Sequence, residues 1–497
     1  MDAGLADPET RQAKFTSKGI PALAMLPSYI PGKPTGSESG VYAALDLGGT
    51  NFRVSVVELF NALQQEHLNP NDGQQAEKVT VTQTKMPIPL ELKSAHIDEL
   101  HEYMCGRMLK YLKDIMASSN RKTTEAAGAA TAVNFNCPVG YTFSYPVDQR
   151  GAASGVLTQW TKEFSCPGAV GNDIVALINK SLAETAAKQS LRASSDDNGV
   201  AMHAHVAAIL NDTVAALLAA AYLDPRTCIG VIAGTGSNAC YLEKISRIIK
   251  LDPTWKENYS TQSGKANLDD EVMAINIEWG AADAGRQVLP FTEYDVQLDK
   301  ESSIPGAQLF EKTISGKYLG EIVRLVLADL IQKKVLFASA SALVRPPPPY
   351  NLETEDLGTI LNNANTDVDG PIGTLIATKF KSADTGFTPS PEDIATIRQV
   401  CSAVVRRAGK FMGAGLVTLL KRSVSPADLD INTSPGVVIA VDGALWKFMS
   451  EFRDAVKEGM QIVFGDENNM KGVSFFPVKS GSSIGAAIAA MMVTRGH

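Results

Sequence analysis

The sequence has no excess of basic residues, and its acidic residues form no tail. Over 497 residues, 46 Lys and Arg are outnumbered by 54 Asp and Glu, which are spread along the chain. Nucleic-acid binders carry a basic stripe or patch, and none is visible here. The composition also excludes low-complexity, collagen and coiled-coil chains. We therefore expect a globular protein with no nucleic-acid partner.

Cysteines are few, and long hydrophobic runs are absent. No C-x-x-C pair occurs among the six cysteines, which is typical of reduced thiols in an intracellular protein. Residues 1–18 have no apolar centre, which argues against a secretory signal. The most apolar stretch, 206–223, carries Asp212 near its centre, and a charge is costly inside a membrane. The sequence thus predicts a cytoplasmic protein with no membrane span.

Two apolar strands each end in a Gly-rich turn and are followed by a second strand. Residues 41–47 and 52–57 flank Gly48-Gly49-Thr50-Asn51, and residues 228–233 and 239–245 flank a similar turn at 234–238. Glycines let backbone N–H groups approach an anion closely, and Thr adds a hydroxyl donor. The alternative is a pair of ordinary hairpin turns. The repetition favours an internal duplication with one phosphate-binding hairpin in each domain.

Helical periodicity predicts helices at 97–116, 171–191, 394–420 and 484–493. The Pro run in 343–371 indicates an exposed excursion. Residues 203–210 are typical of a strand, and 213–222 of a helix, with Asp212 between them. A carboxylate at the carboxyl end of a strand lies where open α/β sheets bind ligands, and it could accept a proton there. Asp212 could instead be the N-cap of the helix.

Three other motifs have weaker functional interpretations. Gly234-x-Gly236-x-x-Ala239 fits a dinucleotide fingerprint, but the next residues are typical of a strand rather than the required helix. Residues 481–485 match a nucleophile elbow, but only the terminal His497 follows Ser483. His203 and His205 share a strand face without an acidic or Cys partner at ligand spacing. No Walker A lysine motif exists, so a bound nucleotide would depend on the paired hairpins.

The ordered motifs resemble those of the hexokinase family, of the fungal or eukaryotic type, from about residue 20 to 495. They are LDLGGTNFRV at 45–54, YTFSYP at 141–146, WTK at 160–162, LNDTV at 210–214, GTGSNACY at 234–241, NIEWGA at 276–281 and VDG at 441–443. The resemblance implies an α/β protein with the actin-like ATPase (ribonuclease H-like) fold, two α/β domains around a central cleft. We expect a small domain at 40–209 plus 480–497 and a large domain at 1–39 plus 210–479.

The same resemblance implies ATP-dependent phosphorylation of the 6-hydroxyl of a hexose, with glucose expected, giving hexose 6-phosphate and ADP. Asp212 would be the general base, and Lys162 would face the transferring phosphoryl group. The residues expected to hold the sugar hydroxyls are Ser144, Thr161, Lys162, Asn211, Asp212, Asn238, Glu278 and Glu311. Carboxylates and amides suit this task, because each sugar hydroxyl both donates and accepts.

The resemblance also implies ATP and Mg²⁺, with the metal held mainly by the phosphates and not by protein ligands. The residues expected around the nucleotide are Asp46, Gly48, Gly49, Thr50, Asn51, Arg53, Lys85, Gly234, Thr235, Gly236, Asp442, Gly443 and Ser482. The expected partners are a glucose-like hexose and regulatory proteins, for a monomer or dimer. Glu163, Asp283 and Ala444 depart from the family pattern. These departures leave a second hypothesis, a catalytically weak sugar sensor.

Overall fold

The computed structural model describes residues 23–61, 78–124, 134–161, 163–192, 201–265, 267–269, 271–338, 344–363, 367–382, 388–430, 432–465 and 467–495. Its contacts group the chain into two compact units. Unit 1 contains Met1–Met25, Cys228–Tyr241 and Ile277–Pro477, and unit 2 contains Leu26–Thr227, Leu242–Asn276 and Val478–His497. The domain boundaries expected from the sequence stay a prediction.

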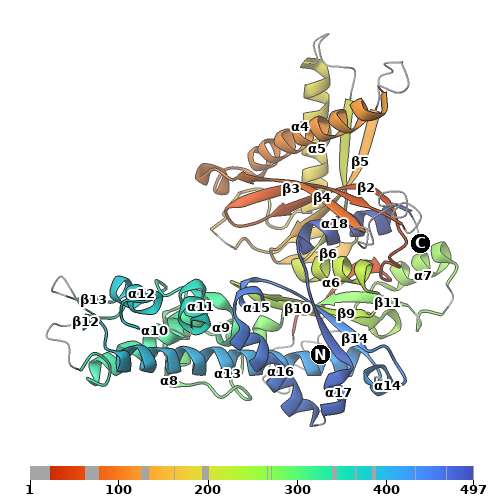
Figure 1. Cartoon of the computed structure of the whole chain (residues 1–497). Helices are drawn as coiled ribbons and strands as arrows, with labels where there is room; N and C mark the ends of the chain where they lie inside the picture. The colour runs from red at the N-terminus through yellow and green to blue at the C-terminus, as the bar shows by residue number, and fades with distance from the viewer. Residues whose placement is uncertain are drawn as a thin grey trace. The chain divides into compact units, whose positions relative to one another are not determined.

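Unit 2 is built on a five-stranded mixed sheet (Figure 1). In spatial order its strands are β4 (Val79–Pro87), β3 (Asn51–Leu59), β2 (Gly40–Leu47), β5 (Asn134–Phe143) and β8 (Ala201–Leu210). Strands β2 and β3 pair antiparallel and form the predicted hairpin, and β3 pairs antiparallel with β4. Strands β2, β5 and β8 are parallel neighbours. Their carboxyl ends therefore meet at one edge of the sheet.

Alternating residues give this sheet two buried faces. Leu45 and Tyr141 belong to a hydrophobic cluster that includes Leu100 of helix α4 (Ile97–Thr124) and Ile178 of helix α5 (Ile174–Arg192). The two helices contact each other and cross in the view of Figure 1. The large apolar side chains of the cluster exclude water from this face, which is the main favourable term in folding.

The other face of the sheet packs against helix α18 (Gly481–Arg495), which in turn packs on helix α6 (Asp212–Leu223). Glycines allow α18 to come close to both the sheet and α6. A Cβ at Gly140 of β5 would collide with the backbone of Ala486, and one at Gly485 with the backbone of Ala215. The Cβ-free backbones thus hold α18 directly against the strands that lead to the predicted site.

The remaining elements of unit 2 are short. Strand β1 (Leu26–Pro31) pairs antiparallel with β11 (Val272–Asn276), and β6 (Val147–Gly151) with β7 (Ser154–Leu157). The helices are η1 (Leu90–Lys93), η2 (Ile245–Arg247) and α7 (Pro253–Ser263).

Unit 1 contains the predicted second hairpin, formed by antiparallel β9 (Thr227–Ala233) and β10 (Ser237–Lys244). Beside β9 lies β14 (Val437–Asp442), which pairs parallel with β15 (Val473–Pro477). A further short pair joins β12 (Val344–Arg345) and β13 (Lys381–Ser382). The helices are η3 (Trp279–Ala281), α8 (Glu293–Glu301), α9 (Leu309–Ile314), α10 (Gly316–Gln332), α11 (Thr354–Asn362), α12 (Pro371–Lys379), α13 (Pro391–Ser423), α14 (Pro426–Leu429), α15 (Ala444–Phe448), α16 (Ser450–Phe464) and α17 (Glu467–Lys471).

The predicted helices are confirmed as α4, α5, α13 and α18, each with somewhat different ends. The prediction of an exposed excursion at 343–371 is wrong in part. Residues 354–362 form α11, with Leu357 and Ile360 buried, because the apolar spacing that follows the Pro run is helical. Residues 343 and 364–366 lie outside the described part of the chain. Among the described helices, none is long and apolar enough to cross a membrane.

Two of the weaker motifs are excluded by their surroundings. The Gly234 motif is followed by strand β10 and not by the helix that a dinucleotide site requires. Ser483, the candidate nucleophile, is buried and shares a 2.8 Å hydrogen bond with Ser55 Oγ. It lies within α18 instead of on an exposed turn after a strand.

Candidate functional site

In unit 2, the predicted residues gather at the carboxyl edge of the parallel strands. Leu47 pairs with Phe143, and Thr142 pairs with Leu210, so the ends of β2, β5 and β8 are in register. The residues that follow are the turn starting at Gly48, then Ser144 and Asn211. Topology therefore brings the first Gly-rich turn to the same edge as two predicted sugar residues, where open α/β sheets bind ligands.

Asn211, and not Asp212, is the N-cap of α6. Asn211 has extended backbone angles, and its Oδ1 accepts hydrogen bonds from Thr213 N at 2.9 Å and from Thr213 Oγ1 at 2.8 Å. The interpretation of Asp212 as the cap is therefore wrong. Asp212 is the first residue of the helix and is half-buried, where the positive end of the helix dipole favours a carboxylate.

The first turn is closed by its own backbone and held by an aromatic hydroxyl. Gly48 N donates to Asn51 O at 2.9 Å, and Asn51 Nδ2 donates to Thr50 Oγ1 at 2.8 Å. The Tyr145 hydroxyl donates to Gly48 O at 3.1 Å. Burial, with smaller effects from Cys166 and Asp46, raises the pKa of Tyr145 well above its usual range, which keeps the hydroxyl a donor. Gly49 and Thr50 form the tip of this turn.

Strand register places two cations beside the first turn. Arg53 lies opposite Asp46 on β2 and opposite Lys85 on β4, so all three side chains share one face of the sheet. Arg53 Nη1 pairs with Asp46 Oδ2 at 3.3 Å. Lys85 is exposed. Two cations on neighbouring strands form a positively charged strip next to the turn, which suits phosphate oxygens.

The loop with Thr161 packs on an aromatic cluster. Trp160 stacks on Phe164, and its Nε1 donates to Cys166 O at 2.9 Å. Thr161 is half-buried, and Lys162 lies outside the described residues. Glu163 has φ 68°, a left-handed conformation that favours glycine, and its carboxylate pairs with buried Lys93 at 3.2 Å. A glycine at this position would adopt the same backbone angle without strain.

Ser482 is tied to the same sheet edge through its backbone. Thr142 Oγ1 donates to Ser482 O at 2.9 Å, so the start of α18 is fixed beside the end of β5. The side chain of Ser482 is half-buried. Within unit 2, the structure thus brings together the first turn, Ser144, Asn211, Asp212 and Ser482 at or near one edge.

The second turn, in unit 1, is held by a helix. Gly234 N donates to Gly236 O at 3.0 Å, which closes the turn. The Gly234 carbonyl accepts from Gly316 N at 2.8 Å, and the Thr235 carbonyl accepts from Lys317 N at 3.0 Å. These bonds satisfy two N–H groups in the first turn of α10. The turn's carbonyls therefore point into the protein, away from any anion at its N–H groups.

Two predicted sugar carboxylates accept hydrogen bonds from the strand that leaves this turn, β10. Glu311 Oε1 accepts from Ser237 N at 3.1 Å, and Glu278 Oε1 accepts from Asn238 Nδ2 at 3.0 Å. Glu278 has φ 57°, and such a conformation in a non-glycine residue is typical of functional sites. Unit 1 thus brings Asn238, Glu278 and Glu311 together beside the second turn.

Sequence reasoning assigned no role in this group to two aromatic residues, Trp279 and Tyr318. Trp279 Nε1 donates to Ser237 Oγ at 3.2 Å, and the Trp279 ring packs edge-on against Phe310. Burial and the charge of Glu311 raise the pKa of Tyr318 to about 12. Trp279 was visible in the motif next to Glu278, but Tyr318 carried no signal in the sequence.

Asp442 and Gly443 adjoin the second turn. A Cβ at Gly234 would lie 3.4 Å from Gly443 Cα, and Gly443 has φ 119°, which only glycine adopts readily. Gly443 N donates to the carboxylate of Asp442 at 2.7 Å. Across the described residues, no group of three or more His, Cys, Asp or Glu side chains could hold a metal ion. The placement of Mg²⁺ on the phosphates stays a prediction.

Comparisons with known proteins give a consistent result. Two family models, both described as hexokinase, match residues 1–222 and 228–492. Hexokinase-7 of Oryza sativa subsp. japonica is 34% identical over 492 residues, covering 99% of this chain and 90% of the rice protein. Hexokinase-1 of Schizosaccharomyces pombe is 32% identical over 475 residues, covering 95% of this chain and 84% of the relative.

The chain belongs to the hexokinase family. A solved hexokinase from Schistosoma mansoni, complexed with glucose, has 28% sequence identity and a TM-score of 0.66, covering 99% of this chain and 92% of that one. The predicted actin-like ATPase fold is confirmed by this match. The protein is a sugar kinase that uses ATP to phosphorylate a hexose, and the sugar-sensor hypothesis is not favoured.

Proposed function

We propose that the hexose is glucose, that the acceptor is its 6-hydroxyl, and that Asp212 is the general base. The main support is the geometry of β10. Its first two residues, Ser237 and Asn238, bond to the carboxylates of Glu311 and Glu278 directly after the second Gly-rich turn. Paired carboxylates and an amide suit a ligand whose hydroxyls each donate and accept. Their bonds to the strand that leaves the turn would link sugar binding to the phosphates.

Asp212 has the features of a general base for this reaction. It is a half-buried carboxylate at the start of α6, and the cap provided by Asn211 fixes that helix end. A general base accepts the proton of the attacking hydroxyl and typically contributes about 10²–10⁴-fold to the rate. Ser144, Thr161, Lys162 and Asn211 complete the sugar set in this proposal. Lys162 would also lie near the transferring phosphoryl group.

The two turns would hold the phosphates of ATP. Among the described residues, the N–H groups of Thr235 and Gly236 donate to no protein acceptor, while Gly234 N and Ser237 N are already used within unit 1. In unit 2, phosphate oxygens would be bound by Gly49 and Thr50, together with the cations Arg53 and Lys85. Asp442, Gly443 and Ser482 would lie by the adenosine.

Mg²⁺ would supply charge neutralisation on the transferring phosphates. The polar groups near the turns fit this metal, because they are oxygen donors rather than thiols or imidazoles. Asp46 is the carboxylate of β2 that precedes the first turn, and its Oδ2 pairs with Arg53 Nη1 at 3.3 Å.

The test separates chemistry from binding. Asp212→Asn and Asp212→Ala should lower kcat with glucose about 10²–10⁴-fold, while glucose still changes the tryptophan fluorescence of Trp160 or Trp279. Asp224→Asn is the matched control, because Asp224 follows the other end of the same helix. It should keep kcat within about twofold. Normal turnover in the Asp212 variants would refute the assignment of the base.

A further inference from the structure

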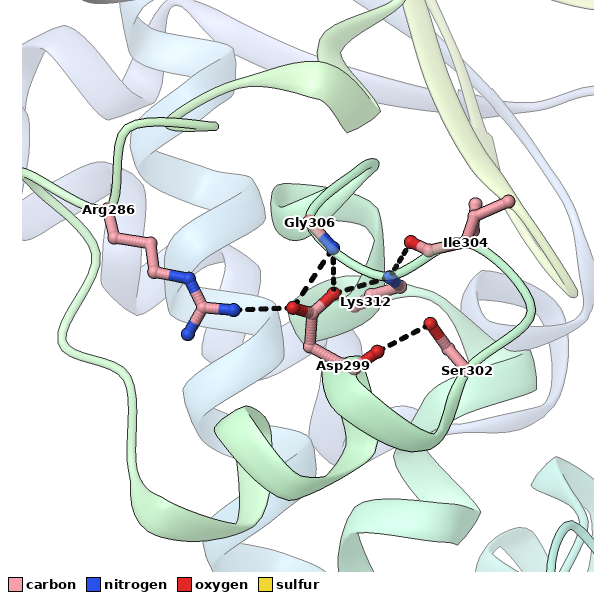
Figure 2. A network of polar contacts seen from close by, with 6 residues as sticks. All are labelled: Arg286, Asp299, Ser302, Ile304, Gly306 and Lys312. Atoms are coloured by element: carbon pink, nitrogen blue, oxygen red, sulfur yellow. Dashed lines mark hydrogen bonds and ion pairs between the residues drawn. The ribbon is translucent and has the colours of Figure 1, made fainter.

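Asp299 is the centre of a buried charge cluster outside the predicted sugar set (Figure 2). Its carboxylate accepts from Lys312 Nζ at 2.6 Å, from Gly306 N at 3.0 and 3.1 Å, and from Arg286 Nη2. Lys312 Nζ donates a second bond to Ile304 O at 2.7 Å. The side chains of Asp299 and Lys312 are only 7% and 4% exposed, so water contributes little to holding either charge.

Lys312 is the neighbour of Glu311 on a short helix that is weakly defined by itself. Helix α9 has six residues, and its N-cap Gln308 has φ 53° with no side-chain cap bond. A helix this short is not stable alone, so tertiary contacts must set its rotation. Successive side chains on a helix point about 100° apart. The bond of Lys312 to Asp299 therefore fixes the direction in which Glu311 meets Ser237.

Arg286 connects Asp299 to the second sugar carboxylate. The chain leaves Glu278 through η3 and enters a turn in which Asp283 accepts from the N–H groups of residues 287, 288 and 289. Arg286 lies inside this turn at φ 51°, and its guanidinium reaches Asp299. Asp299 thus anchors two segments, one that follows Glu278 and one that carries Glu311.

The electrostatics agree with a fixed ionised pair. Burial tends to raise the pKa of Asp299, but the bonds from Lys312 and Gly306 and the charge of Arg286 outweigh it, so the pKa lies below its ordinary value. An ionised Asp299 keeps two cations in place, and each cation restrains one segment. Replacing the pair by apolar residues could preserve packing, but it would release both segments.

We propose that Asp299 and Lys312 are positioning residues that set hexose affinity by holding the carboxylates of Glu278 and Glu311. This inference rests on the proposed sugar-binding role of those two carboxylates. Asp299 and Lys312 do not touch the sugar. Their role is to keep Glu311 at Ser237 and Glu278 at Asn238 before the sugar arrives, so that binding does not have to order them.

The experiment compares KM values for glucose and ATP in full-length variants. Asp299→Asn and Lys312→Met should each raise the glucose KM about tenfold or more, with the ATP KM within about twofold. Lys312→Arg keeps the charge and should return the glucose KM to within about threefold of the parent. The matched control is the more exposed pair Asp329 and Lys333 in the same unit, joined at 2.7 Å. Asp329→Asn and Lys333→Met should change neither KM.

A double-mutant cycle separates positioning from general weakening. If Lys312 acts through Glu311, the double variant Lys312→Met/Glu311→Gln should have nearly the glucose KM of Glu311→Gln alone. Additive effects, or a lower kcat at unchanged glucose KM, would overturn the inference. If both Asp299→Asn and Lys312→Met fail to fold, the pair is a folding element and the inference is also overturned. If Glu311→Gln itself leaves the glucose KM unchanged, the proposed sugar site fails instead.

Discussion

The two units stabilise their Gly-rich turns by different chemistry. In unit 1, the turn at 234–236 is held by α10 and by a group of carboxylates supported by buried ion pairs. In unit 2, the turn at 48–50 is held by backbone bonds and by the hydroxyl of Tyr145. The two turns look equivalent in sequence, but carboxylates bond to the strand after the second turn, whereas a tyrosine hydroxyl bonds to the first.

The buried polar residues show the same contrast among the described positions. In unit 1 the buried charged residues are Asp295, Asp299, Lys312, Glu321, Arg324 and Asp393. In unit 2 they are Lys93 and Glu243, and hydroxyl pairs such as Ser55 with Ser483 are more typical. Buried charges are costly but directional, which would suit the proposed role of unit 1 in orienting carboxylates for a sugar. A neutral hydroxyl is sufficient where a side chain only has to bond to a backbone carbonyl, as Tyr145 does.

The largest predicted effect is on stability. Arg407 makes two 2.7 Å bonds to buried Asp295, and Arg407→Met would remove this cation and leave the carboxylate with its bonds from Thr292. We expect a loss of about 3–5 kcal/mol in the free energy of unfolding, measured by denaturant titration. Ser483→Ala in unit 2 removes only a neutral bond to Ser55 and should cost about 1–2 kcal/mol. Equal losses would contradict the contrast between the units.

The pH dependence should differ as well. Burial lowers the pKa of His101 in unit 2 to about 4 from 6.5, so the folded state binds fewer protons than the unfolded state between these values. His101 therefore does not lower the free energy of unfolding above pH 6.5. As the pH falls towards 4, the free energy of unfolding decreases by up to about 3 kcal/mol. His101→Leu should flatten this decline in thermal unfolding scans.

Unit 1 provides the comparison for that scan. The pKa values of Asp295 and Asp299 are lowered, mainly because their cationic partners outweigh the effect of burial. Their stabilisation persists above the ordinary carboxyl pKa and is lost only below it. A decline between pH 6.5 and 4 that survives in His101→Leu would contradict the assignment to this residue.

Matched glycine substitutions test the two turns directly. A Cβ at Gly236 would lie 2.9 Å from Glu311 Oε1, whereas one at Gly48 would lie 3.1 Å from Asn51 O. Gly236→Ala should displace the Glu311 carboxylate and raise the glucose KM about tenfold. Gly48→Ala should alter the ATP KM and leave the glucose KM within about twofold. Steady-state kinetics with each substrate varied give both KM values. The opposite pattern in the two variants would contradict this assignment of the turns.

The smallest predicted effect concerns Glu163. Glu163→Gly removes strain at φ 68° but also removes the partner of buried Lys93. Strain of this kind costs about 1–3 kcal/mol, and an unpaired buried Lys costs a similar amount. The two effects should nearly cancel, so the free energy of unfolding should stay within about 1 kcal/mol of the parent value. A Lys93→Met/Glu163→Gly variant should then be more stable than either single variant, and a less stable one would contradict this balance.

Much of the fold followed from local patterns. Alternation around Gly48 and Gly234 predicted both hairpins, and helical spacing predicted α4, α5, α13 and α18. The N-cap of α6 could not be assigned, because Asn211 and Asp212 are both good caps and only the backbone angles distinguish them. Helix α11 was hidden by the Pro run that precedes it.

The residues that support the candidate site could not be predicted from the sequence. Asp299 and Lys312 are separated along the chain, and nothing in their spacing indicates a shared ion pair. The contact of Gly316 N with the Gly234 carbonyl likewise depends on tertiary packing. The family motifs identified the residues expected to meet the substrates, whereas the residues that position them became visible only in three dimensions.

The most direct test is to identify the position of the new phosphate. Glucose, ATP and Mg²⁺ would be incubated with the enzyme, and the product examined by proton-coupled ³¹P NMR. Transfer to the 6-hydroxyl predicts a phosphomonoester signal split by two methylene protons. A signal split by a single ring proton, or inorganic phosphate alone, would contradict the proposed reaction.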